Sequence, residues 1–438
     1  MHLHLPVTRR TFLCGTAPLV VPGRVFGQRA PSNRITVGVI GVGRQTVQVN
    51  LKQFLSMPDV QVVAVCDVDA WRLDNAAKQV DDAYAEQSRS GAYKGCRKFR
   101  DSRELLADPA IDAVFIGTPD HWHVPLSIAA IQAGKDVACE KPLTRSIAEG
   151  RQLSDLATKH KRVFRNDSEF RSLENFHRAV ELVRNGRIGK VHTIRSGVPG
   201  TDVGCPPQAD IPVPEGLDYE RWQGPAPRAA YTEKRVHPPK SYDRPGWMRH
   251  RYYCDGMVTN WGAHLNDIAQ WGNNTERTGP VEVEARGTFP PADSFWNVML
   301  TFEAEYRYAN GVRLFYKTDT PYVRFEGSEG WILAEYNKPL QSSSPAILAA
   351  KLREDEIHFP LKSDKQDFID AVKSRGRTLE DAEVGHRTMT VNHLANIAVT
   401  VGGKLQWDPA AERFTNSEAA NAYVKKAILQ PATPGVRQ

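Results

Sequence analysis

Cysteine is scarce in this sequence, and the few cysteines present are not spaced as pairs. The chain has 438 residues and six cysteines, with no CxxC or other paired spacing among them. This pattern predicts neither a disulfide framework nor a zinc site. Cys66 and Cys139 lie within apolar runs and are interpreted as buried thiols.

Long apolar runs and a strong charge bias are also missing. No apolar run is long enough to cross a bilayer. Lysines and arginines are scattered, the formal net charge is only +6, and no basic stripe interleaves with aromatic residues. We therefore predict no membrane span and no nucleic-acid partner. The composition is typical of a soluble globular protein, and the length predicts two domains.

Residues 1–27 resemble a twin-arginine export signal. Arg9 and Arg10 precede a modest apolar stretch, residues 12–21, and a plausible cleavage site follows before Gln28. A basic tail is the alternative interpretation. This segment holds three arginines and no acid, so the remaining chain has a net charge of +3. The prediction is export to the periplasm by a route that carries folded proteins, which is compatible with reduced cysteines.

Residues 28–165 alternate short apolar runs with helical patterns, which predicts a parallel sheet covered by helices. A helix is expected over residues 47–57, and the polar residues 81–94 are interpreted as a surface insertion. The expected strands cover residues 35–40, 60–65, 111–116 and 136–139.

A glycine turn follows the first expected strand. Gly41 and Gly43 match the first two glycines of the dinucleotide fingerprint, which permit a tight turn and close approach to a pyrophosphate. Thr46 replaces the third glycine, so the helix should pack less closely on the strand. Asp67 ends the second strand, where it can accept hydrogen bonds from a ribose 2′-hydroxyl. Together these residues predict a dinucleotide site.

The acid at position 67 favours NAD over NADP, because a carboxylate repels a 2′-phosphate. Arg44 and Arg72 leave NADP open, since either could pair with that phosphate.

Two further loops should reach the same sheet edge. One follows the strand at 111–116, and the other carries Glu140 and Lys141 after the strand at 136–139. Two histidines in the first loop lack a third ligand nearby, so hydrogen-bonding roles are preferred and no metal is predicted. Including the glycine turn and Asp67, the expected cofactor-binding residues are Gly41, Gly43, Arg44, Asp67, Thr118, Pro119, His121, His123, Glu140 and Lys141.

These motifs, in this order and spacing, resemble those of the Gfo/Idh/MocA oxidoreductases. The resemblance continues beyond the nucleotide half, through residues 181–190, 255–267 and 327–330. It implies an α/β fold with an N-terminal Rossmann domain, residues 28–165. It also implies an α+β domain with a large open, mostly antiparallel sheet, residues 166–438.

The later sequence fits that implied second domain. Strands are expected over residues 298–303, 312–318 and 322–326, and helices over residues 365–373 and 383–399. In relatives the last helices pack back toward the nucleotide domain, and the open sheet often mediates oligomers. A homo-oligomer, either a dimer or a tetramer, is therefore expected.

The resemblance also implies catalytic residues. Lys141 and His264 would sit at the substrate hydroxyl, with Lys141 orienting the substrate and sharing in proton transfer. Asn260 stands where many relatives carry aspartate, one helical turn before the histidine. It can orient His264 by a hydrogen bond but supplies no charge. Asp267 is interpreted as structural. The alternative interpretations are that Lys141 is a solvent-exposed lysine in a turn and that His264 is a structural histidine of a helix. Substrate contacts are expected from Arg171, Tyr252 and Tyr253.

Three functions fit these features. The first is an NAD-dependent oxidoreductase acting on a carbinol of a sugar, polyol or related carbohydrate, with tightly retained cofactor. The second is an NAD-dependent glycoside hydrolase of the same fold, without net redox change. The third is a nucleotide-binding module without catalysis, which the pairing of Lys141 with His264 disfavours.

Overall fold

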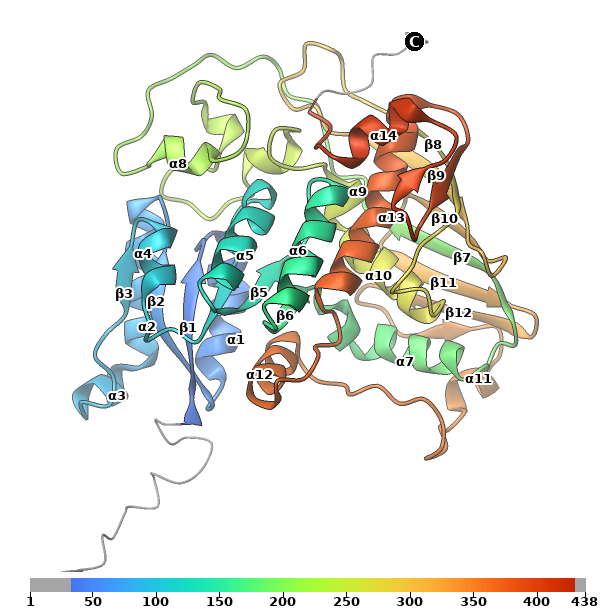
Figure 1. The fold of residues 1–438 in the computed structure, drawn as a ribbon, viewed down its shortest axis with the longest axis horizontal. Helices are drawn as coiled ribbons and strands as arrows, with labels where there is room; N and C mark the ends of the chain where they lie inside the picture. Colours follow the sequence, from blue (N-terminus) through green and yellow to red (C-terminus); the bar gives the residue numbers. More distant parts are fainter. Residues whose placement is uncertain (1–32, 430–438) are drawn as a thin grey trace, which may run out of the picture.

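Six parallel strands form the N-terminal sheet of the computed structural model, which describes residues 33–429 (Figure 1). The strand order reverses between β1 and β4, and open parallel sheets bind ligands at such a switch point. The predicted export signal lies outside the described residues. In spatial order the strands are β3 (Arg97–Phe99), β2 (Val60–Cys66), β1 (Ile35–Ile40), β4 (Ala113–Ile116), β5 (Asp136–Glu140) and β6 (Phe164–Asp167).

Helices cover both faces of this sheet, and several begin at a side chain that caps them. Asp69 caps α2, Asp101 caps α4 and Ser146 caps α6 by accepting a backbone N–H of the first turn. The helices and turns of this part are η3 (Thr46–Asn50), α1 (Leu51–Ser56), α2 (Ala70–Ala83), α3 (Ala85–Arg89), α4 (Ser102–Ala107), η4 (Asp120–Trp122), α5 (His123–Gln132) and α6 (Ile147–Lys159).

Two sequence-based expectations need correction here. The helix expected over residues 47–57 is interrupted, because the π-helical turn η3 precedes α1. Residues 81–94 are more than a surface insertion, since Tyr84 and Tyr93 are buried and pack edge-on at 4.9 Å. The Tyr84 hydroxyl accepts the N–H of Val62, and the Tyr93 hydroxyl donates to its carbonyl, so both rings cover β2.

A second, nine-stranded sheet forms the C-terminal part, and β7 and β10 are the one parallel pair among its described strands. This arrangement confirms the predicted fold class. In spatial order the strands are β13 (Gln341–Ser342), β12 (Gly330–Glu335), β11 (Tyr322–Gly327), β7 (Val191–Val198), β10 (Arg313–Thr318), β9 (Thr301–Arg307), β8 (Glu282–Thr288), β14 (Leu405–Asp408) and β15 (Arg413–Phe414).

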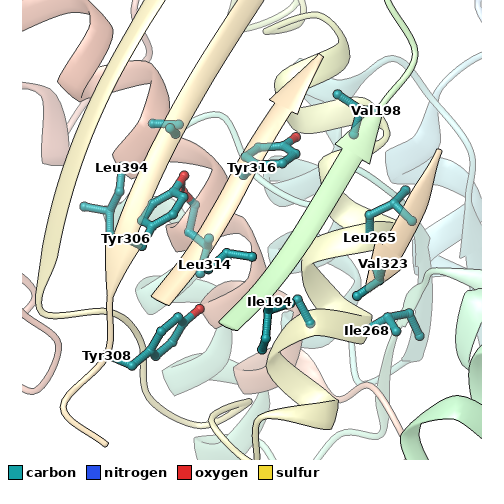
Figure 2. Packing of buried hydrophobic residues seen from close by; sticks show 14 of the residues in the cluster. Ile194, Val198, Leu265, Ile268, Tyr306, Tyr308, Leu314, Tyr316, Val323 and Leu394 are labelled. Atoms are coloured by element: carbon teal, nitrogen blue, oxygen red, sulfur yellow. Dashed lines mark hydrogen bonds between the residues drawn. The ribbon is translucent and has the colours of Figure 1, made fainter. Parts of the chain in front are cut away.

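One face of the large sheet packs on helices, and this contact is the main core (Figure 2). Ile194 and Leu314 on the sheet are fully buried with Leu265 of α10 and Leu394 of α13. The remaining helices and turns are η5 (Glu169–Ser172), α7 (Glu174–Arg184), α8 (Tyr219–Gln223), η6 (Glu233–Arg235), η7 (Gly246–Arg249), α9 (Met257–Asn260), α10 (Gly262–Gly272), α11 (Pro345–Ala349), α12 (Asp364–Ser374), α13 (Ala382–Val401) and α14 (Glu418–Val424).

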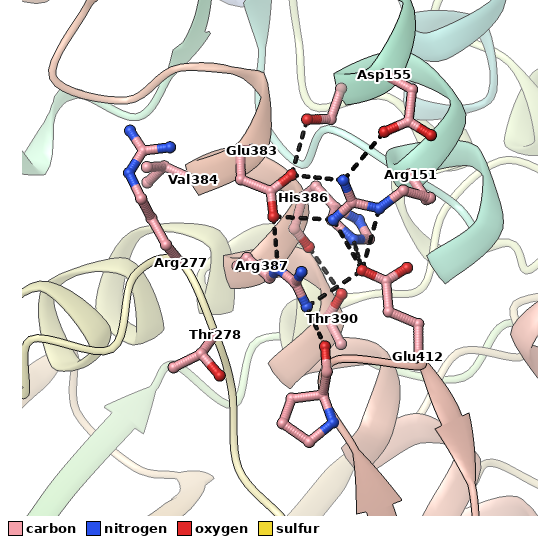
Figure 3. Close-up of polar contacts among 12 residues, drawn as sticks. Arg151, Asp155, Arg277, Thr278, Glu383, Val384, His386, Arg387, Thr390 and Glu412 are labelled. Carbon is pink, nitrogen blue, oxygen red and sulfur yellow. Dashed lines mark hydrogen bonds and ion pairs between the residues drawn. The ribbon is translucent and has the colours of Figure 1, made fainter. Parts of the chain in front are cut away.

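Helices α12 and α13 return to the nucleotide sheet. Lys365 of α12 makes a fully buried ion pair with Asp167 at the end of β6, two residues beyond the expected domain boundary. On α6, Arg151 binds Glu383 of α13 at 2.7 Å and Glu412 at 2.8 Å (Figure 3). These contacts tie the two domains together through side chains that are far apart in sequence.

The carboxyls of Glu383 and Glu412 make this junction sensitive to acid. Burial alone would raise each pKa, but hydrogen bonds from Arg151, joined by Arg387 or His386, lower both values to about 2. Both groups therefore stabilise the fold above the ordinary glutamate pKa of 4.5, and this contribution is lost as the pH falls toward 2.

We expect Arg151→Met to reduce the acid sensitivity of folding. Without the guanidinium, both folded-state pKa values move back toward the unfolded value, so the decline in stability below pH 4.5 becomes shallower. Thermal unfolding between pH 7 and pH 3 measures this slope. Arg313→Met, which removes an exposed pair with Glu305, should leave it unchanged. Equal slopes for Arg151→Met and the unaltered protein would contradict the assignment.

Across residues 33–429, none of the helices combines the length and the apolar character needed to span a membrane.

Candidate functional site

A cleft of about 470 Å³ opens at the carboxyl edge of the parallel sheet, where its strand order reverses. This volume lies within the range of small-molecule sites. Its walls come from the glycine turn, the ends of β2, β4 and β5, helix α9, and the segment between β7 and α9. We call this last segment, residues 199–256, the covering segment. In Figure 1 this segment, which includes α8, crosses the end of the nucleotide domain.

The two predicted glycines shape the turn at the floor of the cleft. Gly41 has a φ of +82°, and a Cβ there would lie 2.6 Å from the amide nitrogen of Thr118. A Cβ on Gly43 would meet nothing within 4 Å, so the backbone at Gly43 is open to a ligand. Thr46 closes the turn by donating its hydroxyl to the Gly41 carbonyl at 2.8 Å. The threonine hydroxyl thus ties the start of the following helix to the turn.

Asp67 lies on the cleft wall at the end of β2, as its motif predicts. Its carboxylate accepts backbone N–H groups from Val42 at 2.8 Å and from Asp69 at 2.9 Å. Burial raises its pKa, and these two hydrogen bonds oppose the rise. The position suits ribose hydroxyls that donate to the remaining lone pairs.

The two arginines that left NADP open differ in the structure. Arg72 is buried and pairs with Asp69 at 3.0 Å, and it also donates to the carbonyl oxygens of Pro238 and Ser241. Arg44 is exposed on the cleft wall. Arg72 is therefore engaged in holding the covering segment.

Lys141 meets Asn260 across the two domains. The Lys141 Nζ donates to the Asn260 Oδ1 at 3.4 Å, and both residues line the cleft. Glu140 is held behind them, since its carboxylate accepts the Asn50 amide at 2.6 Å and the Lys141 backbone N–H at 3.2 Å. The Lys141–Pro142 peptide bond is cis. Three of the predicted residues thus converge at the β5 end of the cleft.

His264 lies behind this convergence and is 3% exposed. Its Nδ1 is 2.8 Å from the Ser168 hydroxyl, and its ring stacks on Phe170 at 4.3 Å. Burial, helped by the charge of Lys141, lowers its pKa well below the usual value, so the imidazole is neutral at pH 7. The ring is therefore oriented by Ser168 and Phe170, whereas Asn260 accepts a hydrogen bond from Lys141. The catalytic role of His264 stays a prediction.

The predicted cofactor contacts of His121 and His123 need correction. Neither side chain lines the cleft. His121 binds the Trp222 carbonyl at 3.0 Å, and His123 bridges the carbonyls of Thr118 and Pro142, each at 2.8 Å. Burial lowers the pKa of both rings, which suits neutral hydrogen-bonding roles. These histidines position the loops that form the cleft, and Thr118 and Pro119 provide its surface.

The predicted substrate contacts of Arg171 and Tyr253 are wrong, because both side chains are buried away from the cleft, whereas the contact of the partly exposed Tyr252 stays a prediction. Arg171 is 1% exposed and forms two hydrogen bonds, at 2.6 and 2.7 Å, with the Asp267 carboxylate. Tyr253 is fully buried in a hydrophobic cluster within the covering segment, and Tyr252 packs beside it. The structural role of Asp267 agrees with its interpretation from the sequence.

The sequence patterns did not single out several residues of the cleft. Asp120 lies between Pro119 and His121, two predicted cofactor contacts, and could have been noticed there. Trp222, His237 and Trp247 come from the covering segment, whose sequence has no periodic pattern to place it over the cleft. Among residues 33–429, no cluster of three or more histidine, cysteine, aspartate or glutamate side chains could hold a metal ion.

A parallel sheet with a switch point, an open glycine turn and an acid at the end of β2 define a dinucleotide-binding protein. Family models match in the same two parts: an oxidoreductase-family NAD-binding Rossmann fold at residues 35–168, and an oxidoreductase-family C-terminal alpha/beta domain at residues 202–433. The chain belongs to this Gfo/Idh/MocA oxidoreductase family, and its cofactor is NAD.

Curated relatives resemble the chain over part of its length. A glycosyl hydrolase family 109 protein of Saccharopolyspora erythraea is 32% identical over 36% of this chain and 33% of the relative. A myo-inositol 2-dehydrogenase of Thermotoga maritima is 30% identical over 43% of this chain and 49% of the relative. The matches thus span a third to a half of the length of these relatives.

The fold is also found in an aldose-aldose oxidoreductase from Caulobacter crescentus, solved with glycerol. That structure superposes with a TM-score of 0.61 at 16% identity, covering 85% of this chain and 99% of the other. At this identity the likeness concerns the fold.

Proposed function

We propose that the protein is an NAD-dependent oxidoreductase that acts on a carbinol of a sugar, polyol or related carbohydrate and keeps its cofactor bound. The observation that carries this proposal is the position of Lys141, which comes from the nucleotide sheet and meets Asn260 of the second domain inside the cleft. Such a place lets one side chain reach both the cofactor and a substrate.

The residues of the cleft fit the cofactor. The open backbone at Gly43 would hold the pyrophosphate, and Asp67 would hold the adenosine ribose. The buried Thr118 hydroxyl has no hydrogen-bond partner among the described residues, and it lies on the same wall. In a Rossmann domain the two halves of the dinucleotide bind on opposite sides of the switch point. Lys141, after β5, therefore belongs to the nicotinamide side.

When bound, the nicotinamide supplies a hydride acceptor. The chain itself has to bind the carbinol and move the hydroxyl proton. Lys141 would bind the substrate hydroxyl and share in transfer of its proton, held in place by Asn260. His264 would assist as a neutral imidazole, because its lowered pKa leaves it uncharged at pH 7.

An NAD-dependent glycoside hydrolase is the second candidate, favoured by the likeness to a family 109 glycosyl hydrolase. Such an enzyme oxidises a sugar carbon, eliminates the aglycone, adds water and returns the hydride. Incubation with free sugars and aryl glycosides separates the two functions. Stoichiometric NADH, or an oxidised product with a reduced acceptor, supports the oxidoreductase. Aglycone release without net NADH supports the hydrolase.

Retention of the cofactor is supported by the way the covering segment closes the cleft. Its backbone pairs with the edge of the nucleotide domain through Ala70 N–H to Gly216 O and Asp218 N–H to Val68 O, both at 3.0 Å. Asp69 pairs with Arg72 and, at 3.0 Å, with His237 of the covering segment. Hydrogen bonds with the nucleotide domain thus hold this segment over the adenosine side.

We expect Asp69→Asn to release the cofactor faster. The amide still caps α2 but loses the charge that holds Arg72 and His237, and Asp69 itself does not line the cleft. Losing a hydrogen bond to a charged group costs about 1.5–3 kcal/mol, which predicts about 10- to 100-fold faster NADH dissociation. Stopped-flow fluorescence measures that rate. The matched control is Asp74→Asn on α2, which removes an exposed ion pair with Lys98 of β3. A dissociation rate equal to that of this control would refute the role of Asp69 in holding the covering segment over the cofactor.

The same proposal includes export by the twin-arginine route to the periplasm, because free nicotinamide cofactor is scarce there and a retained one need not be replaced. Protein purified from that compartment should carry bound nicotinamide, detectable by mass spectrometry. Fully active protein that arrives empty and needs added NAD would contradict it.

We also propose that the protein forms a homo-oligomer, either a dimer or a tetramer, whose subunits contact one another through the open sheet.

A further inference from the structure

Asp120 is a buried carboxyl on the cleft wall that has no assigned role in the chemistry above. It begins the turn η4 in the loop that follows β4, and it is 3% exposed. Its Oδ2 has no hydrogen-bond partner among residues 33–429. A buried carboxyl oxygen without a partner costs free energy, so it is expected at a place where a ligand compensates it.

The position of Asp120 assigns it to the nicotinamide side of the cleft. It stands at the end of β4, next to β5 and Lys141, whereas Asp67 marks the adenosine side at the end of β2. The guanidinium of Arg145 is already paired, because its Nε donates to the Asp255 carboxylate at 2.9 Å. The charged or titratable groups that face Asp120 are Lys141, Arg145, Asp255, Cys139 and Cys254.

We propose that Asp120 is a proton-carrying residue of this site, ionised while the cleft holds NAD⁺ and protonated while it holds NADH. The proposal rests on NAD binding in this cleft and on the proposed oxidation of a carbinol. It adds the destination of the proton that the oxidation releases.

The physical reason is charge balance in an enclosed site. An oxidised nicotinamide ring is positive, and a nearby carboxylate compensates it; a reduced ring is neutral, and a buried carboxylate beside it would be unpaired. Burial raises the pKa of Asp120 to about 8, against the lowering effect of Arg145 and Lys141. At neutral pH the carboxyl of Asp120 can therefore gain or lose its proton when the charge of the neighbouring nicotinamide ring changes by one.

The proton and electron balance is complete. The substrate C–H bond breaks, and its hydrogen leaves with two electrons as hydride to NAD⁺, which is reduced. The substrate O–H bond breaks, the carbonyl forms, and the proton passes through Lys141 to the Asp120 carboxylate. In the return half-reaction a carbonyl acceptor takes the hydride from NADH and the proton from Asp120. The protein therefore exchanges no net proton with solvent over the full cycle.

Infrared difference spectroscopy tests this without a known substrate. The purified protein is exchanged into NAD⁺ or NADH by long incubation with an excess of either, and the two forms are compared between pH 6 and pH 9. We expect the carbonyl stretch of a protonated carboxylic acid in the NADH form and its absence in the NAD⁺ form at pH 7. The Asp120→Asn variant should lose this difference.

Asp101→Asn is the matched control. Asp101 also lines the cleft, but hydrogen bonds from Arg103 lower its pKa to about 2, so it stays ionised with either nucleotide. The redox-dependent band should therefore persist in this variant. Absence of the band in the unaltered protein, or its persistence in Asp120→Asn, would overturn the proposal. Samples without bound nucleotide, seen from missing near-ultraviolet absorbance of NADH, would instead refute the cofactor site and this inference with it.

Discussion

Replacement of Lys141 by alanine is expected to lower kcat/KM by about 10²- to 10⁴-fold, the usual contribution of a positioned acid–base group. The variant should keep its nucleotide, because the glycine turn, Asp67 and the covering segment are unchanged. Steady-state kinetics with a substrate identified from the sugar panel measures turnover. Mass spectrometry of the purified variant measures nucleotide content.

A second substitution separates charge from proton transfer at this position. Lys141→Arg keeps a positive charge next to Asn260, but a guanidinium does not release its proton in proteins. We expect a loss nearly as large as that of Lys141→Ala, and recovery of most activity would limit the lysine to an electrostatic role. Lys98→Ala, a surface position on β3, serves as control. Unchanged turnover in Lys141→Ala would refute the assigned role.

Replacement of Arg171 by methionine is expected to lower the free energy of unfolding by about 3–5 kcal/mol, because it leaves a buried carboxylate without its partner. Arg171 binds Asp267 through two short hydrogen bonds, pairs with Glu276 at 3.0 Å and lies over the Trp271 ring. Asp267 is completely buried, so water cannot compensate the lost partner.

Denaturant unfolding of the variant measures this effect, and a double substitution identifies its cause. Adding Asp267→Asn to Arg171→Met removes the uncompensated charge and should restore part of the stability. Arg286→Ala breaks the exposed pair with Glu303 and should change stability by less than about 1 kcal/mol. A similarly small effect of Arg171→Met would show that the position tolerates a neutral side chain and that its ion pair is dispensable.

The glycine turn and Lys141 were predictable because each directly follows a strand with an apolar pattern. Strand ends in a parallel sheet meet at one edge, so short motifs after successive strands come together. The convergence of Gly41, Asp67 and Lys141 in one cleft follows from this rule. His264 could be recognised by resemblance, whereas its packing against Ser168 and Phe170 depends on a different part of the chain.

The errors concern residues whose side-chain direction depends on distant partners. Arg171 was expected at the substrate, but Asp267, 96 residues later, binds it in the interior. His121 was expected at the cofactor, but the Trp222 carbonyl of the covering segment draws it away from the cleft. Composition and motif spacing describe neither contact, because both partners come from other elements.

The sequence by itself determined the two-domain class, the dinucleotide turn and the lysine, since these depend on local periodicity and on motifs at strand ends. The tertiary structure decided which polar residues face the cleft. Asp120 and Asn260 face it, while His121, Arg171 and Tyr253 are buried elsewhere. The physical reason is that a buried polar group points to whatever partner satisfies it. That partner is found only when the two sheets, the returning helices and the covering segment are packed together.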